Sequence, residues 1–331
     1  MDNKVYVIMY HYVRNLEHSR YPRIKGLDIA CFRKQIEYLK QNFTVITMEE
    51  LNSAFNNQYE LPKQAVLLTF DDGYLDHYTS VFPILKAEHL QGSFFISGKT
   101  LKEHVLLDVN KIHYILATTQ IDVLLPSVLK RMDYYRGSEY EYPDNDTLFH
   151  EYASGNRFDS KETIFVKRML QTVLPEKVRS KICDDLFKKY VGISEDKLAG
   201  ELYLTSDQIR LMKQEGMYIG LHGYNHYWLG RLPEEEMQKD IRQALDVMSE
   251  YIDDNNWVMN YPYGSYNEEL LQYISSTGCK LGLTTQVKVA DLSECSSLQF
   301  RALTPTIFHP SVKNLNAVWT RNGHEPGGET L

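Results

Sequence analysis

The chain has 331 residues, of which 43% are hydrophobic and 24% are charged, and its formal net charge at pH 7 is −8. This ordinary globular composition suffices for the core of one large domain or of two small ones. An acidic chain repels phosphate backbones, so we exclude nucleic acid as its main partner.

Short apolar runs rich in β-branched and aromatic residues recur along the chain, and each ends near a polar or glycine-bearing turn. They predict strands at residues 5–10, 44–47, 65–70, 93–97, 217–221, 257–261, 280–284 and 299–303. Helical patterns separate most of them, at residues 31–41, 48–55, 209–215, 233–252 and 267–277. Thr47 with Glu50, and Thr205 with Gln208, have the spacing of capping boxes at two of these helices. The alternation predicts an α/β protein with a parallel sheet, and seven to eight strands favour a barrel.

The alternation stops between residues 101 and 204, which we interpret as a helical insertion. Its patterns predict helices at 109–117, 121–132, 161–173 and 176–190, with a polar link through 134–160. The barrel would then comprise residues 1–100 and 205–320. The insertion is equally compatible with a purely structural subdomain and with a lid or recognition subdomain at the site. We expect the polar tail at 321–331 to be disordered.

The sharpest candidate segment is LLTFDDGY, residues 67–74, in which a buried strand ends at the adjacent carboxylates Asp71 and Asp72. Neighbouring carboxylates repel each other unless a cation or separate protonation roles relieve the repulsion. Asp-Gly is also common in ordinary turns, so this segment alone is equally compatible with a polar turn.

Two further segments follow predicted strands. His222 and His226, in HGYNH, can share one metal ion if the loop turns helical, because positions four apart lie on one face. In NYPYG, residues 260–264, proline and glycine fix a turn in which the backbone N–H of Tyr263 could face an anion. With Asp72, the two histidines would form a three-ligand site with open positions, as catalytic metals require. Asp71 would then act as base for a water whose pKa the metal lowers.

TFDDGY, the HxxxH pair and YPYG, in this order, resemble the motifs of the polysaccharide deacetylase family, carbohydrate esterase family 4. The resemblance covers about residues 1–100 and 205–305, and it implies a distorted (β/α) barrel that removes acetyl groups from sugars, usually with zinc. It also implies a role for each matching residue: Asp71 as catalytic base, Asp72, His222 and His226 as metal ligands, and the N–H of Tyr263 as oxyanion donor.

The chain departs from the family pattern in two places. Many members have an arginine that orients the base where this chain has Asn260, and Arg301 is a candidate substitute. The family's Asp-rich fourth motif has no clear counterpart, and neither has its late histidine, the general acid. His11, at the end of the first predicted strand, and His309, which suits the family's chain order, are the candidates.

We therefore expect a metal-dependent hydrolase that removes an acetyl group from an N-acetylated sugar, lipid-linked or nucleotide-linked, in surface-polysaccharide or glycolipid synthesis. The two histidines and one aspartate suit Zn²⁺, and Co²⁺, Ni²⁺ or Fe²⁺ fit the same donors. Two alternatives stay open: a hydrolase of another amide, such as a formyl group, and a catalytically inactive barrel that binds carbohydrate. Retention of both Asp71 and Asp72 argues against a pure binder.

Three further expectations concern the environment of the protein. No run of 18 apolar residues occurs, so we expect no membrane span. The first residues, MDNKVYVIMYHYV, lack a basic leader with an apolar stretch and cleavage site, so we expect a cytoplasmic protein. The four cysteines, at positions 31, 183, 279 and 295, have irregular spacing, which favours free thiols.

Overall fold

The computed structural model describes residues 3–137, 140–155, 159–286, 289–294 and 296–301, which form two compact units. The first unit comprises residues 3–15, 26–104 and the described chain from residue 201 onwards, and the second comprises residues 16–25 and 105–200. The second unit therefore includes residues 16–25, a segment that the sequence led us to assign to the barrel. The tail predicted at 321–331 lies outside the described residues.

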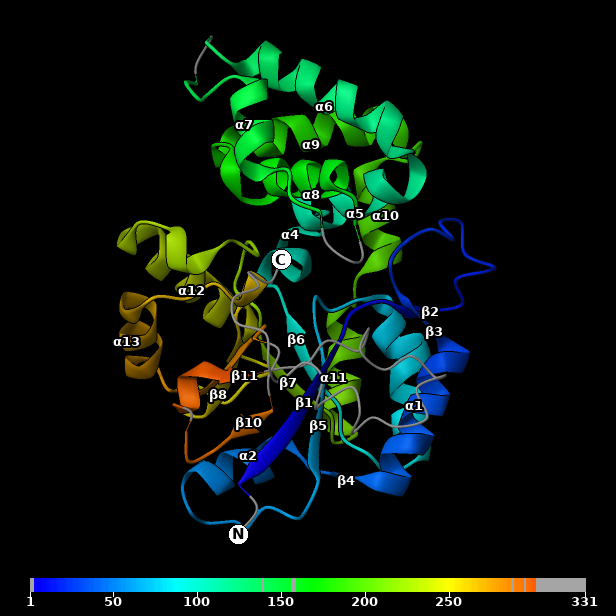
Figure 1. Ribbon diagram of the computed structural model, residues 1–331. Coiled ribbons are helices and arrows are strands. Elements are labelled where there is room, and N and C mark those ends of the chain that lie inside the picture. Colours follow the sequence, from blue (N-terminus) through cyan, green and yellow to red (C-terminus); the bar gives the residue numbers. More distant parts are fainter. Residues whose placement is uncertain (1–2, 138–139, 156–158, 287–288, 295, 302–331) are drawn as a thin grey trace. The chain divides into compact units, whose positions relative to one another are not determined.

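The first unit is built on one curved sheet of nine strands in the order β10-β1-β5-β6-β7-β8-β9-β11, with β4 paired to β5 (Figure 1). The strands are β1 (Lys4–Tyr10), β4 (Thr44–Val45), β5 (Ala65–Phe70), β6 (Ser93–Ile96), β7 (Tyr218–Leu221), β8 (Trp257–Asn260), β9 (Cys279–Thr284), β10 (Ala290–Asp291) and β11 (Phe300–Arg301). All pairs are parallel except β1 with β10. Among the described residues nothing joins β10 to β11, so the barrel is open there. The predicted distorted α/β barrel is confirmed.

Helices surround this sheet. They are α1 (Ile29–Asn42), α2 (Met48–Phe55), α3 (Phe82–Ala87), α4 (Gly98–Glu103), α11 (Ser206–Gln214), α12 (Glu234–Met248) and α13 (Glu268–Ser276). In the view of Figure 1, α1 and α11 lie on the right and α12 and α13 on the left, and all four contribute residues to one core cluster. Both predicted capping boxes are present, at Thr47 with Glu50 and at Thr205 with Gln208. The short strands β2 (Val13–Arg14) and β3 (Leu27–Asp28) form a separate pair.

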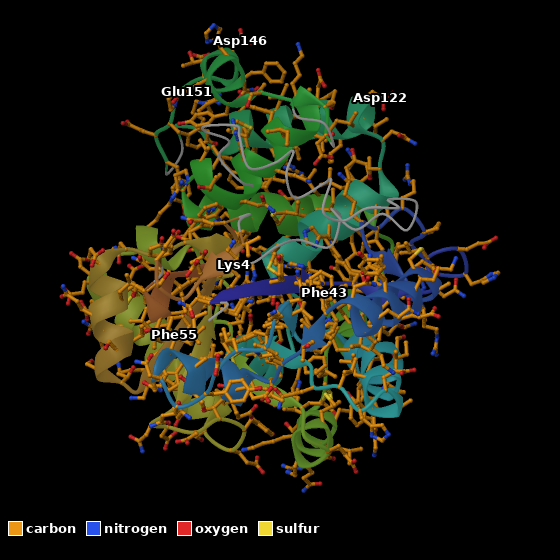
Figure 2. The ribbon with its side chains drawn as sticks, turned by 60° about the horizontal axis from the view of Figure 1, so that its bottom comes forward. Lys4, Phe43, Phe55, Asp122, Asp146 and Glu151 are labelled. Carbon is orange, nitrogen blue, oxygen red and sulfur yellow. The ribbon has the colours of Figure 1, made fainter. Side chains whose placement is uncertain are left out.

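Alternate strand residues divide the core of this unit into two layers. One set, which includes Ile8, Leu68 and Phe94, packs with the surrounding helices. The other set packs with α2: Val5, Val7, Met9, Ala65, Leu67, Phe95, Val258, Leu281, Leu283 and Phe300. In Figure 2, Lys4 marks the first residue of β1 and Phe55 the last residue of α2, whose ring packs edge-on against Phe300 at 5.2 Å. Side chains thus fill the barrel and α2 closes the end where the strands begin, which leaves the carboxyl ends for chemistry.

The second unit is helical. Its helices are α5 (Asp108–Thr118), α6 (Ile121–Tyr135), α7 (Asn145–Tyr152), α8 (Lys161–Arg168), α9 (Glu176–Tyr190) and α10 (Glu195–Leu202), and a π-helical turn, Met169–Val173, extends α8. The buried ammonium group of Lys111 pairs with Asp108, Asp184 and Glu195, which joins α5, α9 and α10. Figure 2 shows the exposed side chains of Asp122, Asp146 and Glu151 on α6 and α7.

Two expectations about the environment can be compared with this structure. Among the helices that the structure describes, none has the length and apolar character needed to cross a bilayer. Cys31, Cys183 and Cys279 are free thiols, and Cys295 lies outside the described residues.

Candidate metal and catalytic site

The three chemical segments of the sequence lie at the carboxyl ends of three strands of one sheet in the first unit. Asp71 and Asp72 follow β5, the segment from His222 to His226 follows β7, and Asn260 is the last residue of β8. Backbone hydrogen bonds continue the sheet into these segments, from Asp71 N to Tyr10 O at 2.9 Å and from His222 N to Ile96 O at 3.1 Å. The segments are therefore positioned by the sheet itself.

Asp72, His222 and His226 bring three buried ligand atoms together. The Nε2 atoms of His222 and His226 lie 3.4 and 3.2 Å from Asp72 Oδ1, and these atoms all lie within 4.8 Å of one another. Burial alone would raise the pKa of Asp72, but the two imidazoles hold that pKa well below its ordinary value. Asp72 is therefore an anion in the site.

These three residues fit a divalent metal ion. His222 Nδ1 lies 2.7 Å from the backbone carbonyl of Asn260, which can only accept a hydrogen bond, so Nδ1 carries the proton and Nε2 presents a lone pair. That lone pair faces Asp72 Oδ1, which is buried without a hydrogen-bond partner among the described residues. Two acceptors in contact repel each other. Without a metal, this repulsion is relieved only if the imidazole takes up a second proton and donates it to Asp72, and with a metal ion between the two atoms both become ligands. Ligands of a tetrahedral zinc ion lie about 3.3 Å apart, which the observed separations match.

Asp71 is the second carboxylate of the segment, and it faces a different set of groups. Its Oδ1 accepts a hydrogen bond of 2.7 Å from Asn260 Nδ2. Burial raises the pKa of Asp71 from 3.8 to about 7, the range in which a carboxylate can exchange protons near neutral pH. The environment thus separates the acidities of two adjacent carboxylates: Asp72 is an anionic ligand and Asp71 is a group that can accept a proton.

Asn260 occupies the position where the sequence lacks the family's arginine, and it contacts both parts of the site. Its side chain orients Asp71, while its carbonyl fixes the tautomer of His222. Support for Asp71 therefore comes from Asn260 itself, at the position where the sequence offered no orienting group. Arg301, the candidate substitute, lies on β11, and its side chain is outside the part of the structure that is described.

A buried carboxylate, Asp240, holds the loop between the two candidate histidine ligands. It accepts hydrogen bonds from the backbone of Tyr224 at 2.7 Å and of Asn225 at 3.0 Å, and from Asn225 Nδ2 at 2.9 Å. Gly223 has φ +67°, and a Cβ there would lie 3.1 Å from Asp240 Oδ1, so the loop needs glycine at this position. Asp240 was missed in the sequence, although it falls on the apolar face of α12 that also carries Met237, Ile241 and Ala244.

Tyr263 lies beside the ligands in the short 3-10 turn η4 (Pro262–Gly264). Its ring is stacked on Trp228 at 4.6 Å with an interplanar angle of 7°, and it meets the ring of His226 edge-on at 4.7 Å. Gly264 follows with φ +66°, and a Cβ there would lie 2.2 Å from Thr285 Oγ1, so only glycine fits. Two ring contacts and a restrictive turn thus hold the backbone of Tyr263 in place.

Three residues of the site have the left-handed backbone that side chains other than glycine rarely adopt. The φ angles are +72° at Asp72, +60° at His226 and +58° at Tyr263. Such a strained conformation persists only where several surrounding contacts hold it in place, and it is common at functional sites.

Of the two candidate general acids, only His11 lies among the described residues. His11 follows β1, and its Nε2 lies 4.0 Å from Asp71 Oδ2 with 39% of the side chain exposed. His77, in a π-helical turn (His77–Val81), donates its Nε2 proton to the carbonyl of His11 at 2.9 Å and so supports the backbone there. His309 lies outside the described residues. The structure therefore brings His11, but not His309, into the described site.

Comparison with known proteins identifies the family of this chain. The family model described as "Polysaccharide deacetylase" matches residues 58–141 and 158–282. The Bacillus subtilis protein YxkH, whose name assigns it to the polysaccharide deacetylases, is 19% identical over 86% of this chain and 65% of its own. The poly-β-1,6-N-acetyl-D-glucosamine N-deacetylase of Escherichia coli K12 is 38% identical over 20% of this chain and 10% of its own. This chain thus matches less than two thirds of the length of either relative.

Solved structures show the same fold. The Streptococcus pyogenes deacetylase PplD, solved in complex with acetate, superposes with a TM-score of 0.56 at 17% identity and covers 92% of this chain and 93% of that one. IcaB from Ammonifex degensii gives a TM-score of 0.53 at 19% identity, over 92% and 91% of the two chains.

Proposed function

Because the chain belongs to the polysaccharide deacetylase family, we propose that it is a metal-dependent hydrolase that removes the acetyl group from an N-acetylated sugar. The observation that carries the proposal is the convergence of Asp72, His222 and His226 on one point, with Asp71 beside them. A divalent metal held by these three residues supplies Lewis-acid catalysis and lowers the pKa of a water at the acetyl carbonyl. The nitrogen and oxygen donors favour Zn²⁺.

The residues around that point then have separate tasks. Asp71, oriented by Asn260, accepts the proton of the water that attacks the acetyl carbon. The N–H of Tyr263 donates to the carbonyl oxygen as negative charge develops on it. His11, partly exposed beside Asp71, donates the proton that lets the amine leave. Water and the acetamide are thereby converted to acetate and a free amino sugar.

The substrate class is a further part of the proposal. The name of the Escherichia coli relative supports an N-acetylglucosamine polymer or a precursor of one. We propose a sugar destined for a surface polysaccharide or glycolipid, carried on lipid or nucleotide in the cytoplasm. Cell fractionation tests the location, and parallel assays of free, lipid-linked and nucleotide-linked N-acetylglucosamine test the carrier.

The deciding experiment measures acetate and free amine released from β-1,6- and β-1,4-linked N-acetylglucosamine oligomers by the zinc-loaded protein. We expect equal amounts of both products, no turnover after chelation, and recovery on adding zinc. Asp71→Asn should keep its zinc and lose about 10²–10⁴-fold in kcat, the usual contribution of a general base. Release of formate from N-formyl sugars without release of acetate would instead identify a hydrolase of another amide. Sugar binding that is equal in wild type and Asp71→Asn, without turnover, would identify a carbohydrate-binding barrel.

A further inference from the structure

The two carboxylate oxygens of Asp72 have different partners. Oδ1 faces the Nε2 atoms of His222 and His226, whereas Oδ2 accepts a hydrogen bond of 2.5 Å from the hydroxyl of Tyr74. We infer that Tyr74 is a positioning residue that holds Asp72 as a metal ligand through Oδ1 alone. This inference rests on the proposed function, because it needs a metal in the site.

The ring of Tyr74 is fixed firmly enough for this task. Its side chain is fully buried, and its ring is stacked on Tyr12 at 4.1 Å with an interplanar angle of 14°. Tyr203 lies parallel to it at 6.3 Å, and His77 meets it edge-on at 5.6 Å. The backbones of Tyr74 and Tyr203 also form an antiparallel bridge. A ring held by three other rings and by its backbone has little freedom to withdraw its hydroxyl group from Asp72.

The hydrogen bond determines how many coordination positions the protein occupies. A carboxylate that is free to turn can offer a metal either one oxygen or two, and a second oxygen would take a position that water or substrate needs. With Oδ2 engaged by Tyr74, the protein presents one oxygen from Asp72 and one nitrogen from each histidine. The backbone of Asp72 is left-handed, with φ +72°, and such a conformation persists only where surrounding contacts hold it. The hydrogen bond from Tyr74 is one of these contacts.

Tyr74→Phe tests this inference, because it removes the hydroxyl and keeps the ring. Outer-shell partners of ligands usually contribute 10–100-fold to metal affinity, so we expect Zn²⁺ to bind about 10–100-fold more weakly, measured by competition with a chromophoric chelator. The visible spectrum of the Co²⁺ form should also change, because the carboxylate can turn. The matched control is Tyr10→Phe, which removes a buried hydroxyl that donates to Gln35. We expect it to bind Zn²⁺ like wild type.

A crystal structure of the wild-type zinc complex supplies a second test that does not depend on how the variant folds. We expect one Asp72 oxygen at about 2.0–2.2 Å from zinc, with the other still on the Tyr74 hydroxyl. Two Asp72 oxygens on the metal would overturn the inference, as would a Tyr74→Phe affinity within twofold of wild type. In both cases the zinc site itself would stand. Failure of wild type to bind Zn²⁺, Co²⁺ or Ni²⁺ would overturn the proposed function together with this inference.

Discussion

The side-chain amide of Asn260 donates a hydrogen bond of 2.7 Å to the carboxylate of Asp71, and the two residues are 189 positions apart in the chain. The carbonyl of the same asparagine accepts from His222 Nδ1. One residue at the end of β8 therefore connects the candidate base with a candidate metal ligand. It does so through two different groups, the side-chain amide and the backbone carbonyl, and a substitution can remove the first while it keeps the second.

Asn260→Ala removes the amide and keeps the carbonyl. We expect kcat to fall about 10–100-fold, because a hydrogen bond to a charged group contributes about 1.5–3 kcal/mol. Zinc content should stay near that of wild type, because the backbone still holds His222. Steady-state deacetylation and elemental analysis measure the two effects. Asn52→Ala, which removes a buried amide in contact with Asn256 on the barrel's opposite end, is the control, and an equal loss in both variants would contradict the prediction.

The acidity of Asp71 predicts a pH-dependent stability of the metal-free protein. Burial raises its pKa in the folded state to about 7 from 3.8, so the folded state binds this proton more tightly than the unfolded state does. The contribution to stability is complete below about pH 4 and is lost as pH rises towards 7. Asp71→Asn has no titrating carboxyl group at this position, so its free energy of unfolding relative to wild type should rise by about 2–3 kcal/mol between pH 5 and pH 8. Urea unfolding in chelator measures this difference, and a difference independent of pH would contradict it.

Asp240→Ala tests the support of the histidine loop. Removing this carboxylate leaves the buried N–H groups of Tyr224 and Asn225 without their acceptor, which should lower the free energy of unfolding by about 2–4 kcal/mol. Zinc binding should weaken as well, because the loop joins His222 to His226. Asp246→Ala changes an exposed carboxylate of the same helix, and we expect both quantities to stay within experimental error of wild type.

Trp228→Ala removes the ring on which Tyr263 is stacked. The expected result is a loss of up to about tenfold in kcat, because an aromatic pair contributes about 0.5–1.5 kcal/mol and here it holds the proposed oxyanion donor. Trp228→Phe keeps a stacked ring and should retain most activity. Zinc affinity separates this effect from a change at His226: equal losses of affinity and of kcat would show that the ring supports the ligand instead.

The sequence predicts the barrel well because its strands are short apolar runs with clear ends. The motifs at those ends lie together because parallel strands place their carboxyl ends at one edge of the sheet. The contact between Asn260 and Asp71 could not be predicted, since it depends on the register of strands distant in the chain. The helix α7 was missed within a polar stretch, where Asp144 caps it by accepting from the N–H of Thr147.

Asp240 was also missed in the sequence, but a signal for it was present. Met237, Ile241 and Ala244 surround it on the buried face of the helix, and a carboxylate among such apolar residues is a recognisable signal of a buried hydrogen-bonding role. The N–H groups that donate to Asp240 belong to the loop that follows Gly223. The left-handed backbone of this glycine leaves no periodic pattern in the sequence, so the partners of Asp240 could not be predicted. Residues 16–25 read LEHSRYPRIK, a polar segment, and such a segment between two parts of the barrel carries no signal for the unit against which it packs.

The left-handed backbone at Asp72, His226 and Tyr263 has an evolutionary consequence. Each such residue costs about 1–3 kcal/mol, which is a large fraction of the net stability of a domain. Substituting glycine at Asp72 or His226 would relax the main chain and discard a proposed metal ligand, and at Tyr263 it would discard the ring contacts that hold the proposed oxyanion donor in place. Selection for a more stable barrel and selection for turnover therefore oppose each other at the same three positions. A descendant of this chain released from its catalytic role should change there first.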